Sequence, residues 1–546
     1  MFVPNKKIAV IGALSALLVF MAWAAYTSSS YTSSLQERPF NAGVVGKVST
    51  LDPSKVTTHE EKLVASTLYE GLVYYDEDAR SLKPRLAKDW KISADGRKLT
   101  IELKRNILFH NGKQLTAADV KTCWEKALTE AAGGKASLFL PIEGSDRVIK
   151  GAAADLAGLK IVDRYTLVVA FSRPDAAFVY HLTNPAFWIR DTEDKADICP
   201  GTGPFKFKER NDKSIVLTRH DKYHRERPAL TEIQFSLYQD ANQALQDYKA
   251  RKLDYLDQVP LKEVKNIREA SEYNGLYTVK PIQAVYFLGF NVNQEPFADN
   301  FMLRRALNYA IDRQAIIDNI TGGLGQPLKG ALPLGLPGYN KDMRGYSYDP
   351  EQARNLLAQA GYPDGQGLKP LTLTYNKSPG HQQIAEVVAA QLGQLGVQVE
   401  LKSMDWKPYV KELEMKRLKF FRLGWAADYP DVDAFLYPLY HSSRAGVSNF
   451  TGYHNPQADK ILDASRAETK SVKERINLLR RAEEIIVDDA PVLWLFQQEA
   501  FKIVGPDVNG FKLDSMEMVD WYSLELKKPE LEKQTSMIPE VSPSEV

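Results

Sequence analysis

The chain has 546 residues, of which 44% are hydrophobic, so it is long enough to build several lobes with buried cores, as a soluble protein does. Its 70 Lys and Arg residues nearly balance its 69 Asp and Glu residues, and the formal net charge is +1. This balance argues against a nucleic-acid-binding protein and against binding to an anionic surface through bulk charge.

The N-terminus has the composition of an export signal. Lys6 and Lys7 precede an apolar run at residues 8–26, and Ala22-Trp23-Ala24 forms a small-x-small cleavage site. The run is also long enough for an uncleaved membrane anchor, so both outcomes stay open. No Cys follows the run closely, which excludes a lipoprotein modified at an N-terminal Cys. Either outcome places the chain from about residue 38 onward outside the cytoplasm, in the periplasm or beyond, with membrane contact only through this segment.

Cys123 and Cys199 are the only cysteines. In an exported chain they could form a disulfide, and two unpaired thiols are an equally good interpretation. Two cysteines are too few for a four-ligand structural zinc site. His220 and His224 are four residues apart but follow a predicted strand, with no Cys or Glu cluster close by. We therefore expect no metal and no cofactor.

Strands and helices alternate along most of the chain. Residues 99–104 alternate apolar and polar side chains, as a half-buried strand does, and residues 116–120 open a helix. Apolar side chains at residues 303–311 recur at helical spacing. A further helix is predicted between Asp349, its N-cap, and Gly361, its C-terminal stop.

A strand–helix–strand unit is legible at residues 371–401. Leu371, Leu373 and Tyr375 alternate with polar residues, and apolar residues at 384–395 then follow helical spacing. Gly396 ends that helix, and a second alternating strand begins at Val397. A crossover of this length predicts a parallel strand pair with the helix packed on one face.

The segment from Arg422 to Asp428 carries a distinctive set of side chains. Arg422, Trp425 and Asp428 place a cation, a large aromatic ring and a carboxylate within seven residues, and Tyr429-Pro430-Asp431 then predicts a turn. A strand that leads into such a turn can present the indole as an apolar wall and the carboxylate as an anion. This combination suits an organic ligand that carries an ammonium group.

Six short segments form an ordered series along residues 40–527. They lie at 50–53 (TLDP), 68–73 (LYEGLV), 84–90 (PRLAKDW), 99–120, 201–207 (GTGPFKF) and 289–313. Together they resemble the family 5 extracellular solute-binding proteins, which are the peptide, nickel and related receptors of ABC importers. Each segment alone is a weak signal, but six in the family's order make the assignment strong.

The resemblance implies an α/β fold of the periplasmic-binding-protein type (cluster C). Such a fold has two hinged α/β lobes, an extra lobe inserted in the first, and Venus-flytrap closure around the ligand. The implied division is a signal or anchor with a Ser/Thr-rich spacer at 1–37, a first lobe at 38–69, 191–282 and 497–527, an inserted lobe at 70–190, a second lobe at 283–496, and a disordered tail at 528–546.

Near the segment from Arg422 to Asp428, the oligopeptide- and dipeptide-binding members of the family are the most similar. The resemblance implies that Asp428 pairs with the α-ammonium of a peptide. It implies that Arg422 or His381 takes the ligand carboxylate, and that Trp406 and Trp425 line the pocket.

Tyr286 and Phe287 belong to a strand whose backbone could pair with an extended ligand as an added strand. Two departures from the family pattern leave the preferred ligand length open. Thr57 and Thr58 stand where some oligopeptide receptors carry a Glu, and Leu413 stands where they carry a second Arg.

The same residues also have plainer interpretations, and the sequence does not decide between the two. Asp428 could cap the turn before Pro430, and Arg422 could form an ordinary ion pair. His381 could be a solvated side chain in the first turn of a helix, and the four aromatic side chains could serve only the core.

These observations predict an extracytoplasmic receptor that binds short peptides between two lobes and delivers them to the permease and ATPase subunits of an ABC importer. We expect a monomer that is not an enzyme, because no nucleophile elbow and no phosphate-binding loop is present. The alternative keeps the fold and the transport role but changes the ligand to a nickel chelate, haem or another small solute.

Overall fold

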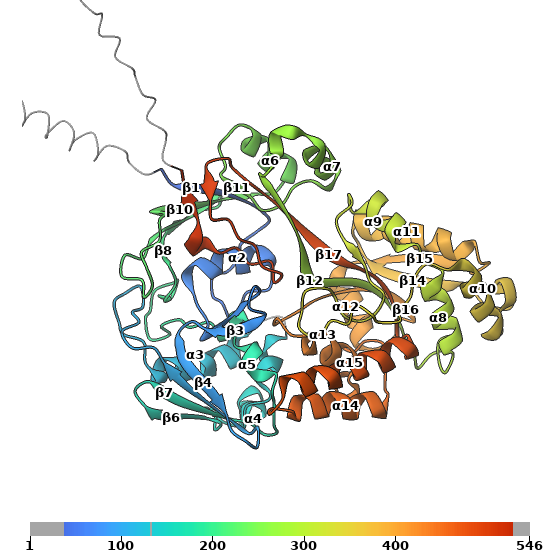
Figure 1. Ribbon diagram of the computed structural model, residues 1–546, viewed down its shortest axis with the longest axis horizontal. Helices are drawn as coiled ribbons and strands as arrows, with labels where there is room; N and C mark the ends of the chain where they lie inside the picture. The colour runs from blue at the N-terminus through green and yellow to red at the C-terminus, as the bar shows by residue number, and fades with distance from the viewer. Residues whose placement is uncertain (1–37, 132–133, 528–546) are drawn as a thin grey trace, which may run out of the picture.

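The computed structural model describes residues 38–131 and 134–527 (Figure 1). The predicted export segment and spacer at 1–37 and the predicted tail at 528–546 lie outside these ranges. Within the described ranges, none of the helices combines the length and the apolar character that crossing a membrane requires.

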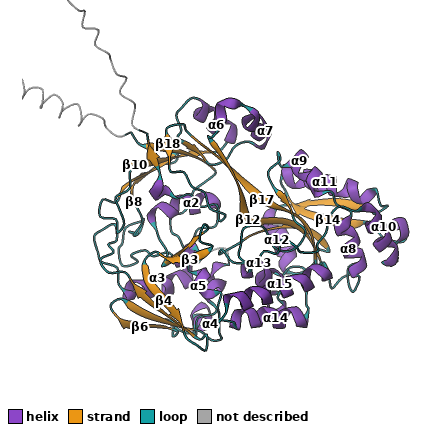
Figure 2. Cartoon of the chain, viewed as in Figure 1, coloured by secondary structure: helices purple, strands orange, loops and turns teal. Residues whose placement is uncertain are grey.

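One 11-stranded sheet runs through the molecule, in the order β15-β14-β16-β12-β17-β11-β1-β10-β9-β8, with β13 paired to β17 (Figure 2). Its strands are β1 (Phe40–Val45), β8 (Phe205–Arg210), β9 (Ser214–Arg219), β10 (Glu232–Tyr238), β11 (Tyr255–Leu256), β12 (Tyr277–Phe290), β13 (Gln326–Pro327), β14 (Leu371–Asn376), β15 (Val399–Met404), β16 (Phe420–Ala426) and β17 (Val492–Val504).

The two longest strands, β12 and β17, join the two halves of this sheet. They pair antiparallel from Tyr277 with Ile503 to Gly289 with Val492, and the register shifts between Pro281 and Val285. The lobe boundaries predicted at 282 and 496 fall inside these two strands. The boundaries themselves stay a prediction.

A separate four-stranded antiparallel sheet has the order β4-β5-β7-β6. It consists of β4 (Ala87–Ile92), β5 (Lys98–Leu103), β6 (Leu159–Asp163) and β7 (Thr166–Ala170). Two further antiparallel pairs join β2 (Val73–Asp76) to β3 (Ser81–Pro84) and β18 (Val508–Asn509) to β19 (Glu525–Leu526). The strand predicted at 99–104 is β5, which confirms that prediction to within one residue.

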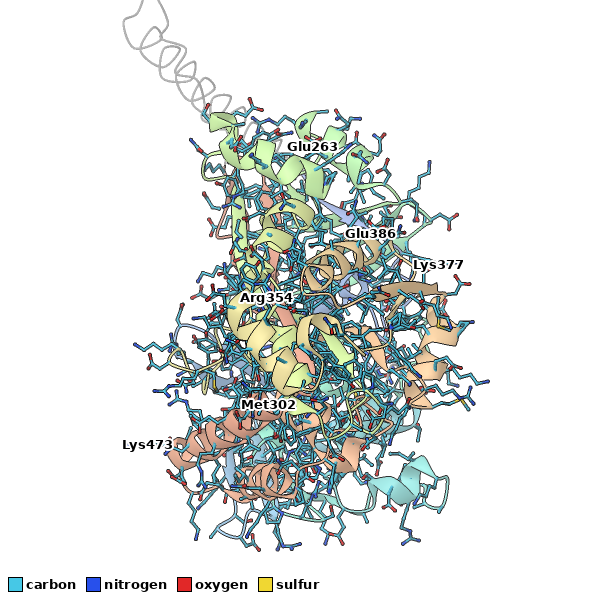
Figure 3. All side chains as sticks on the ribbon, turned by 90° about the vertical axis from the view of Figure 1, so that its right-hand side faces the viewer. Glu263, Met302, Arg354, Lys377, Glu386 and Lys473 are labelled. Atoms are coloured by element: carbon cyan, nitrogen blue, oxygen red, sulfur yellow. The ribbon has the colours of Figure 1, made fainter. Side chains whose placement is uncertain are left out.

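The helices cover both sheets. They are α2 (His59–Leu68), α3 (Ala117–Glu130), α4 (Ser145–Ile149), α5 (Phe178–His181), α6 (Ala241–Lys249), α7 (Leu261–Glu269), α8 (Phe301–Tyr309), α9 (Arg313–Ile320), α10 (Pro350–Gln359), α11 (Pro379–Gly393), α12 (Trp406–Glu414), α13 (Asp433–Tyr440), α14 (Pro456–Ala467) and α15 (Val472–Asp489). Short 3-10 turns are η1 (Lys135–Phe139), η2 (Pro185–Phe187), η3 (Ser271–Tyr273), η4 (Pro363–Gly365), η5 (Ser442–Arg444) and η6 (Trp521–Ser523). Figure 3 shows α8, α10 and α11 on the side of the molecule that faces the viewer, where Arg354 and Glu386 are exposed.

Capping and periodicity account for the helices that the sequence predicts. The Asp349 side chain accepts a hydrogen bond from the backbone N–H of Gln352, so α10 begins where its N-cap predicts. Strands β14 and β15 pair in parallel with α11 between them, which confirms the strand–helix–strand unit. The second strand begins at Val399 and not at Val397, because Val397 still donates to the Leu392 carbonyl at 3.2 Å and closes the helix end.

Apolar side chains on the two faces of β12 enter different cores. Tyr286, Leu288 and Phe290 join the core beneath α8, α9 and α11. Val285 and Phe287 join a larger core that also takes residues from the four-stranded sheet and from α13–α15. The four-stranded sheet and α5 therefore share a core with α13–α15, and Figure 1 shows α5 beside α14 and α15.

Polar contacts join the segments that flank α5 to Asp428 and to α14 as well. The amide of Asn184 donates to the backbone carbonyl of Asp428 at 2.8 Å, and the backbone N–H of Ala176 donates to the carbonyl of Arg466 at 2.7 Å. Cys123 and Cys199 are both free thiols in the structure, and Cys123 is buried.

Candidate functional site

Arg422, His381 and Tyr286 form one cluster at the junction of β16, α11 and β12. The Arg422 guanidinium lies 4.5 Å from the centre of the Tyr286 ring, and Nη1 donates to Asn376 Oδ1 at 3.3 Å. The Tyr286 hydroxyl lies 3.3 Å from His381 Nδ1. In the described ranges, no carboxylate lies within 4.0 Å of this guanidinium. These residues therefore do not support the alternative interpretation that Arg422 forms an ordinary ion pair.

The charges in this cluster favour an anion. Burial, with a further contribution from the Arg422 charge, lowers the pKa of His381 to about 4. Near neutral pH the imidazole is therefore neutral and Arg422 carries the positive charge. Buried Arg422 Nε has no hydrogen-bond partner among the described residues, so the guanidinium has unused capacity to donate. A planar guanidinium of this kind suits a carboxylate.

The backbone beside Arg422 has an open edge. β16 pairs with β12 along its whole length, from Phe420 to Ala426, but β14 pairs with it only at Phe420 and Phe421. Among the described residues, the stretch from Arg422 to Ala426 therefore has a strand partner on one side only. An extended ligand can add to such an edge through backbone hydrogen bonds.

The added-strand hypothesis for Tyr286 and Phe287 is wrong. Tyr286 pairs with Gly424 of β16 on one side and with Phe496 of β17 on the other, so its backbone is already engaged. The Phe287 side chain is 2% exposed and lies in the larger core, on the opposite face of β12 from Tyr286. The free edge belongs to the neighbouring strand.

The two Trp residues flank the open edge in different ways. Trp406, the first residue of α12, is 56% exposed, and its ring lies 6.2 Å from that of Tyr409. The Tyr409 hydroxyl donates to the Arg422 carbonyl where β14 and β16 separate, so α12 lies beside the edge. Trp425 packs against the larger core, on the face of β16 opposite Arg422, and its indole N–H donates to the Ala434 carbonyl at 2.8 Å.

Asp428 lies beyond the end of β16, apart from the Arg422 cluster. Its carboxylate has one long contact, at 3.5 Å, with the amide of buried Asn184. Burial raises the pKa of Asp428 above its ordinary value, and the positive charges of Lys135 and Lys62 act in the opposite direction. A partly desolvated carboxylate with weak hydrogen bonding favours a cationic partner.

Two buried ion pairs anchor the turn that carries this carboxylate. Arg475 of α15 donates two hydrogen bonds of 2.8 Å to Asp431, and Arg466 of α14 donates two of 3.0 Å and 2.7 Å to Asp433. The Tyr429 hydroxyl donates to Asp433 at 2.7 Å. Burial opposes ionisation of Asp433, but the Arg466 charge lowers its pKa to about 2. The turn is therefore held against two helices by charge-assisted bonds.

Gly424 and Asn184 complete the site and were not identified from the sequence. A side chain at Gly424 would bring its Cβ within 3.1 Å of Arg422 Nη2, so glycine leaves room for the guanidinium. A lone Gly inside an apolar strand is a signal of close approach, which the sequence offered. Nothing in the sequence distinguishes Asn184, because it lies in a distant segment.

Other polar clusters have local partners. His220 lies 3.2 Å from the Gly203 carbonyl, and His224 lies 2.8 Å from the Glu70 carboxylate, so the two rings meet different groups. In residues 38–131 and 134–527 one group of three carboxylates is close enough to hold a metal ion, namely Asp119, Asp191 and Glu193. The Lys113 ammonium lies within 3.0 Å of all three, so a cation already occupies that position.

A surface cavity of about 630 Å³ lies between α8, α10 and α15, on the outer side of the second lobe. Arg305, Tyr309 and Tyr346 line it, and none of the candidate residues does. The candidate site is instead the open edge of β16 from Arg422 to Ala426, with Arg422 at one end and Asp428 beyond the other.

Comparisons with known proteins agree with this fold. The family model described as bacterial extracellular solute-binding proteins, family 5 Middle, matches residues 81–447. Heme-binding protein A of Haemophilus influenzae is 28% identical over 81% of this chain and 84% of its own length. The oligopeptide-binding protein OppA of Bacillus subtilis is 29% identical over 78% of this chain and 81% of its own.

Among solved structures, the unliganded open form of the periplasmic murein tripeptide binding protein MppA superposes with a TM-score of 0.77. The two are 25% identical, and the match covers 90% of this chain and 98% of that one. The family match, the relatives and the fold agree, and the chain belongs to the family 5 bacterial extracellular solute-binding proteins.

Proposed function

We propose that this protein captures short peptides along the edge of β16 and delivers them to the permease and ATPase subunits of an ABC importer. The observation that carries the proposal is an open strand edge with an anion-binding group at one end and an anion at the other. Arg422 and His381 take the peptide carboxylate, and Asp428 takes the α-ammonium. The relative OppA, which is named for oligopeptide binding, supports the same ligand class.

The position of the two charged ends explains why a ligand along the edge fits best. Arg422 lies on one face of β16, whereas Trp425 lies on the other and Asp428 lies past the strand end. A ligand in the plane of the sheet can reach groups from both faces. Asp428 lies six positions after Arg422, and an extended chain of that length spans at most about 20 Å. A peptide of about three to six residues can therefore touch both ends.

The proposal includes export and closure. The N-terminal segment directs the chain out of the cytoplasm, and the chain acts there as a monomeric receptor without enzymatic activity. The register shift in β12 between Pro281 and Val285 is the position at which we place the hinge, because an interrupted ladder bends more easily than a continuous one. Closure brings the first lobe onto a ligand held by β16.

A second candidate ligand is haem or another chelate, because one relative is a heme-binding protein. Mass spectrometry of whatever the purified protein retains discriminates between the two. A retained mixture of short peptides supports the proposal, whereas a retained porphyrin or chelate without peptide overturns it.

Calorimetry on Asp428→Asn tests the ammonium contact. We expect a loss of about 10- to 100-fold in affinity for an N-terminally free tripeptide, because a hydrogen bond to a charged group contributes about 1.5–3 kcal/mol. The matched control is Asp488→Asn, because that carboxylate is 75% exposed on α15. An unchanged affinity in Asp428→Asn would show that the carboxylate does not bind the ligand.

A further inference from the structure

Strands β14 and β16 separate at one point, and the Tyr409 side chain lies there. The last pair of their parallel ladder joins Thr374 to Phe421, and in the described part of the chain the ladder goes no further. The Tyr409 hydroxyl donates to the carbonyl of Arg422, the residue directly after that pair, and lies 3.4 Å from the Thr374 carbonyl oxygen. One hydroxyl therefore contacts both strands at the position where their pairing stops.

The sequence around Tyr409 explains how its side chain reaches the sheet. Asp405 ends β15 and caps α12, and the Tyr409 N–H donates to the Asp405 carbonyl at 3.0 Å, which closes the first turn. Tyr409 and Leu413, one turn apart, are the buried residues of α12, so this face of the helix packs on the sheet. The Tyr409 side chain is 0% exposed, and burial raises its pKa, so the hydroxyl keeps the proton that it donates.

The backbone of β16 shows which groups face the gap between the two strands. The N–H of Ala427 donates to the carbonyl of Gln283, which belongs to β12. Backbone groups alternate sides along a strand, so Arg422, Gly424 and Ala426 turn their N–H and C=O groups away from β12, towards β14. The bond from the phenol to the Arg422 carbonyl agrees with this orientation.

The backbone of β14 offers a donor for the same carbonyl. The N–H of Lys377 donates to the Met404 carbonyl of β15 at 2.8 Å, so the preceding residue, Asn376, turns its own N–H towards β16. A continued ladder would bond this N–H to the Arg422 carbonyl, where the Tyr409 hydroxyl now lies. Paired strands lie about 4.8 Å apart, and a hydroxyl that contacts carbonyls of both strands leaves no room for a further pair at that spacing.

On the basis of the function proposed above, we infer that Tyr409 is a positioning residue whose hydroxyl stops the β14–β16 ladder after Phe421 and so keeps the edge of β16 at 424–426 free for the ligand. Without the hydroxyl, Asn376 adds a pair to the ladder, and the two strands close from Arg422 towards Gly424. The same step disturbs the contact of Asn376 Oδ1 with the Arg422 guanidinium, which is 3.3 Å long.

Hydrogen exchange of the purified full chain without ligand, resolved to single amides, tests the inference on Tyr409→Phe, which removes only the hydroxyl. We expect the Asn376 amide to exchange at least about tenfold more slowly in the variant than in the native chain, because it enters the ladder. A substitution that only weakened the fold would speed exchange. The matched control is Tyr248→Phe, because the buried Tyr248 hydroxyl also donates to a backbone carbonyl, that of Val504, at 2.8 Å, and Tyr248 belongs to α6. Exchange at Asn376 should not change in this control.

Calorimetry with Ala-Ala-Ala measures the consequence for binding. We expect Tyr409→Phe to bind the peptide at least about tenfold more weakly, because the ligand first has to reopen the edge, and Tyr248→Phe to bind it as the native chain does. An Asn376 amide that exchanges no more slowly in Tyr409→Phe, or an unchanged affinity, overturns the inference. If the native chain binds no peptide, the proposed function fails, and the exchange rates still decide whether Tyr409 stops the ladder.

The native chain alone gives a second test that needs no variant. Thr374 is paired with β16, whereas Asn376 lies beyond the last pair, so the Asn376 amide should exchange faster than the Thr374 amide in the free protein. Equal protection of the two amides would show that the ladder continues past Tyr409, and the inference would then be wrong even if Tyr409→Phe does not fold.

Discussion

The guanidinium of Arg422 lies 4.5 Å from the centre of the Tyr286 ring, and the hydroxyl of that ring lies 3.3 Å from His381. Strand pairing explains the contact, because Tyr286 stands opposite Gly424 and Leu288 stands opposite Arg422 on adjacent strands. The aromatic face fixes the position of the cation without neutralising it. A carboxylate can therefore still pair with Arg422.

Gly424→Ala should displace this guanidinium. The new Cβ would lie 3.1 Å from Arg422 Nη2, so the guanidinium has to shift by a few tenths of an ångström from its position over the Tyr286 ring. We expect the affinity for a peptide with a free C-terminus to fall by roughly 3- to 10-fold, a cost of about 1 kcal/mol. The affinity for the C-terminally amidated peptide should change much less.

Gly393→Ala is the matched control for that substitution. Gly393 is the last residue of α11, and a Cβ there meets nothing within 4 Å. We expect unchanged peptide binding and a small gain in stability, because Ala is the better helix former by up to about 1 kcal/mol. If both glycine variants bind as the native chain does, Gly424 does not position Arg422.

Trp406 should report ligand binding by fluorescence. It is 56% exposed at the start of α12, next to the open edge of β16, so a ligand and closure would remove it from water. We expect a blue shift of tryptophan emission on titration with peptide, and a loss of most of that shift in Trp406→Phe. Trp494→Phe is the control, because Trp494 is 1% exposed and its surroundings should not change. A shift that survives in Trp406→Phe would exclude Trp406 from the pocket wall.

The two ends of the site should respond to pH in opposite directions. The pKa of His381 is about 4 in the free protein, lowered by burial and then by Arg422, and a bound carboxylate stabilises the imidazolium and raises it. Binding at this end therefore takes up a proton, and affinity rises as the pH falls from 7 towards 5. The pKa of Asp428 is raised in the free protein by burial, and a bound ammonium lowers it, so binding at that end releases a proton.

Calorimetry in buffers of different ionisation enthalpy measures this proton exchange. His381→Gln should abolish proton uptake for a peptide with both termini free, and an amidated peptide should show release only. The free protein should also lose stability as the pH falls from about 6.5 to about 4, because the unfolded chain then binds a proton that half-buried His381 does not. Uptake that persists in His381→Gln would remove His381 from the carboxylate contact.

The buried ion pairs behind the Asp428 turn should dominate local stability. Arg475→Met removes the two hydrogen bonds that Arg475 donates to the buried Asp431 carboxylate, and removing one partner of such a pair costs about 3–5 kcal/mol. Urea unfolding measures this cost. Lys208→Ala is the control, because it breaks a pair with Glu232 whose side chains are 49% and 28% exposed, and it should cost less than about 1 kcal/mol. Equal costs for the two variants would contradict this account of the turn.

The neighbouring ion pair between Asp433 and Arg466 should make the stability of the fold depend on pH. The folded pKa of Asp433 is about 2, because the Arg466 charge outweighs the effect of burial. An acid whose folded pKa is depressed stabilises the fold above its ordinary value of 3.8, and that contribution is lost as the pH falls from about 4 to about 2. Acid unfolding monitored by circular dichroism should therefore shift to higher pH in Asp433→Asn.

The sequence by itself determined the local elements and the residues near the carboxylate. Capping at Asp349 and alternation at Leu371–Asn376 depend on neighbours along the chain, so the corresponding helix and strand could be predicted. The family motifs likewise predicted the fold class, which the comparisons confirmed. Arg422 and Asp428 became candidates through their spacing within one short segment, whereas His381 became one only through the resemblance to the family.

Only the tertiary structure decided which of these residues share a site and which strand edge is open. Strand order is set by pairing between distant segments, so nothing local shows that Tyr286 is paired on both sides while β16 is not. The same long-range packing turns Phe287 into the core and brings Asn184 to Asp428 from a distant segment. Local spacing thus identified the charged side chains, and the pairing of distant strands determined what surrounds them.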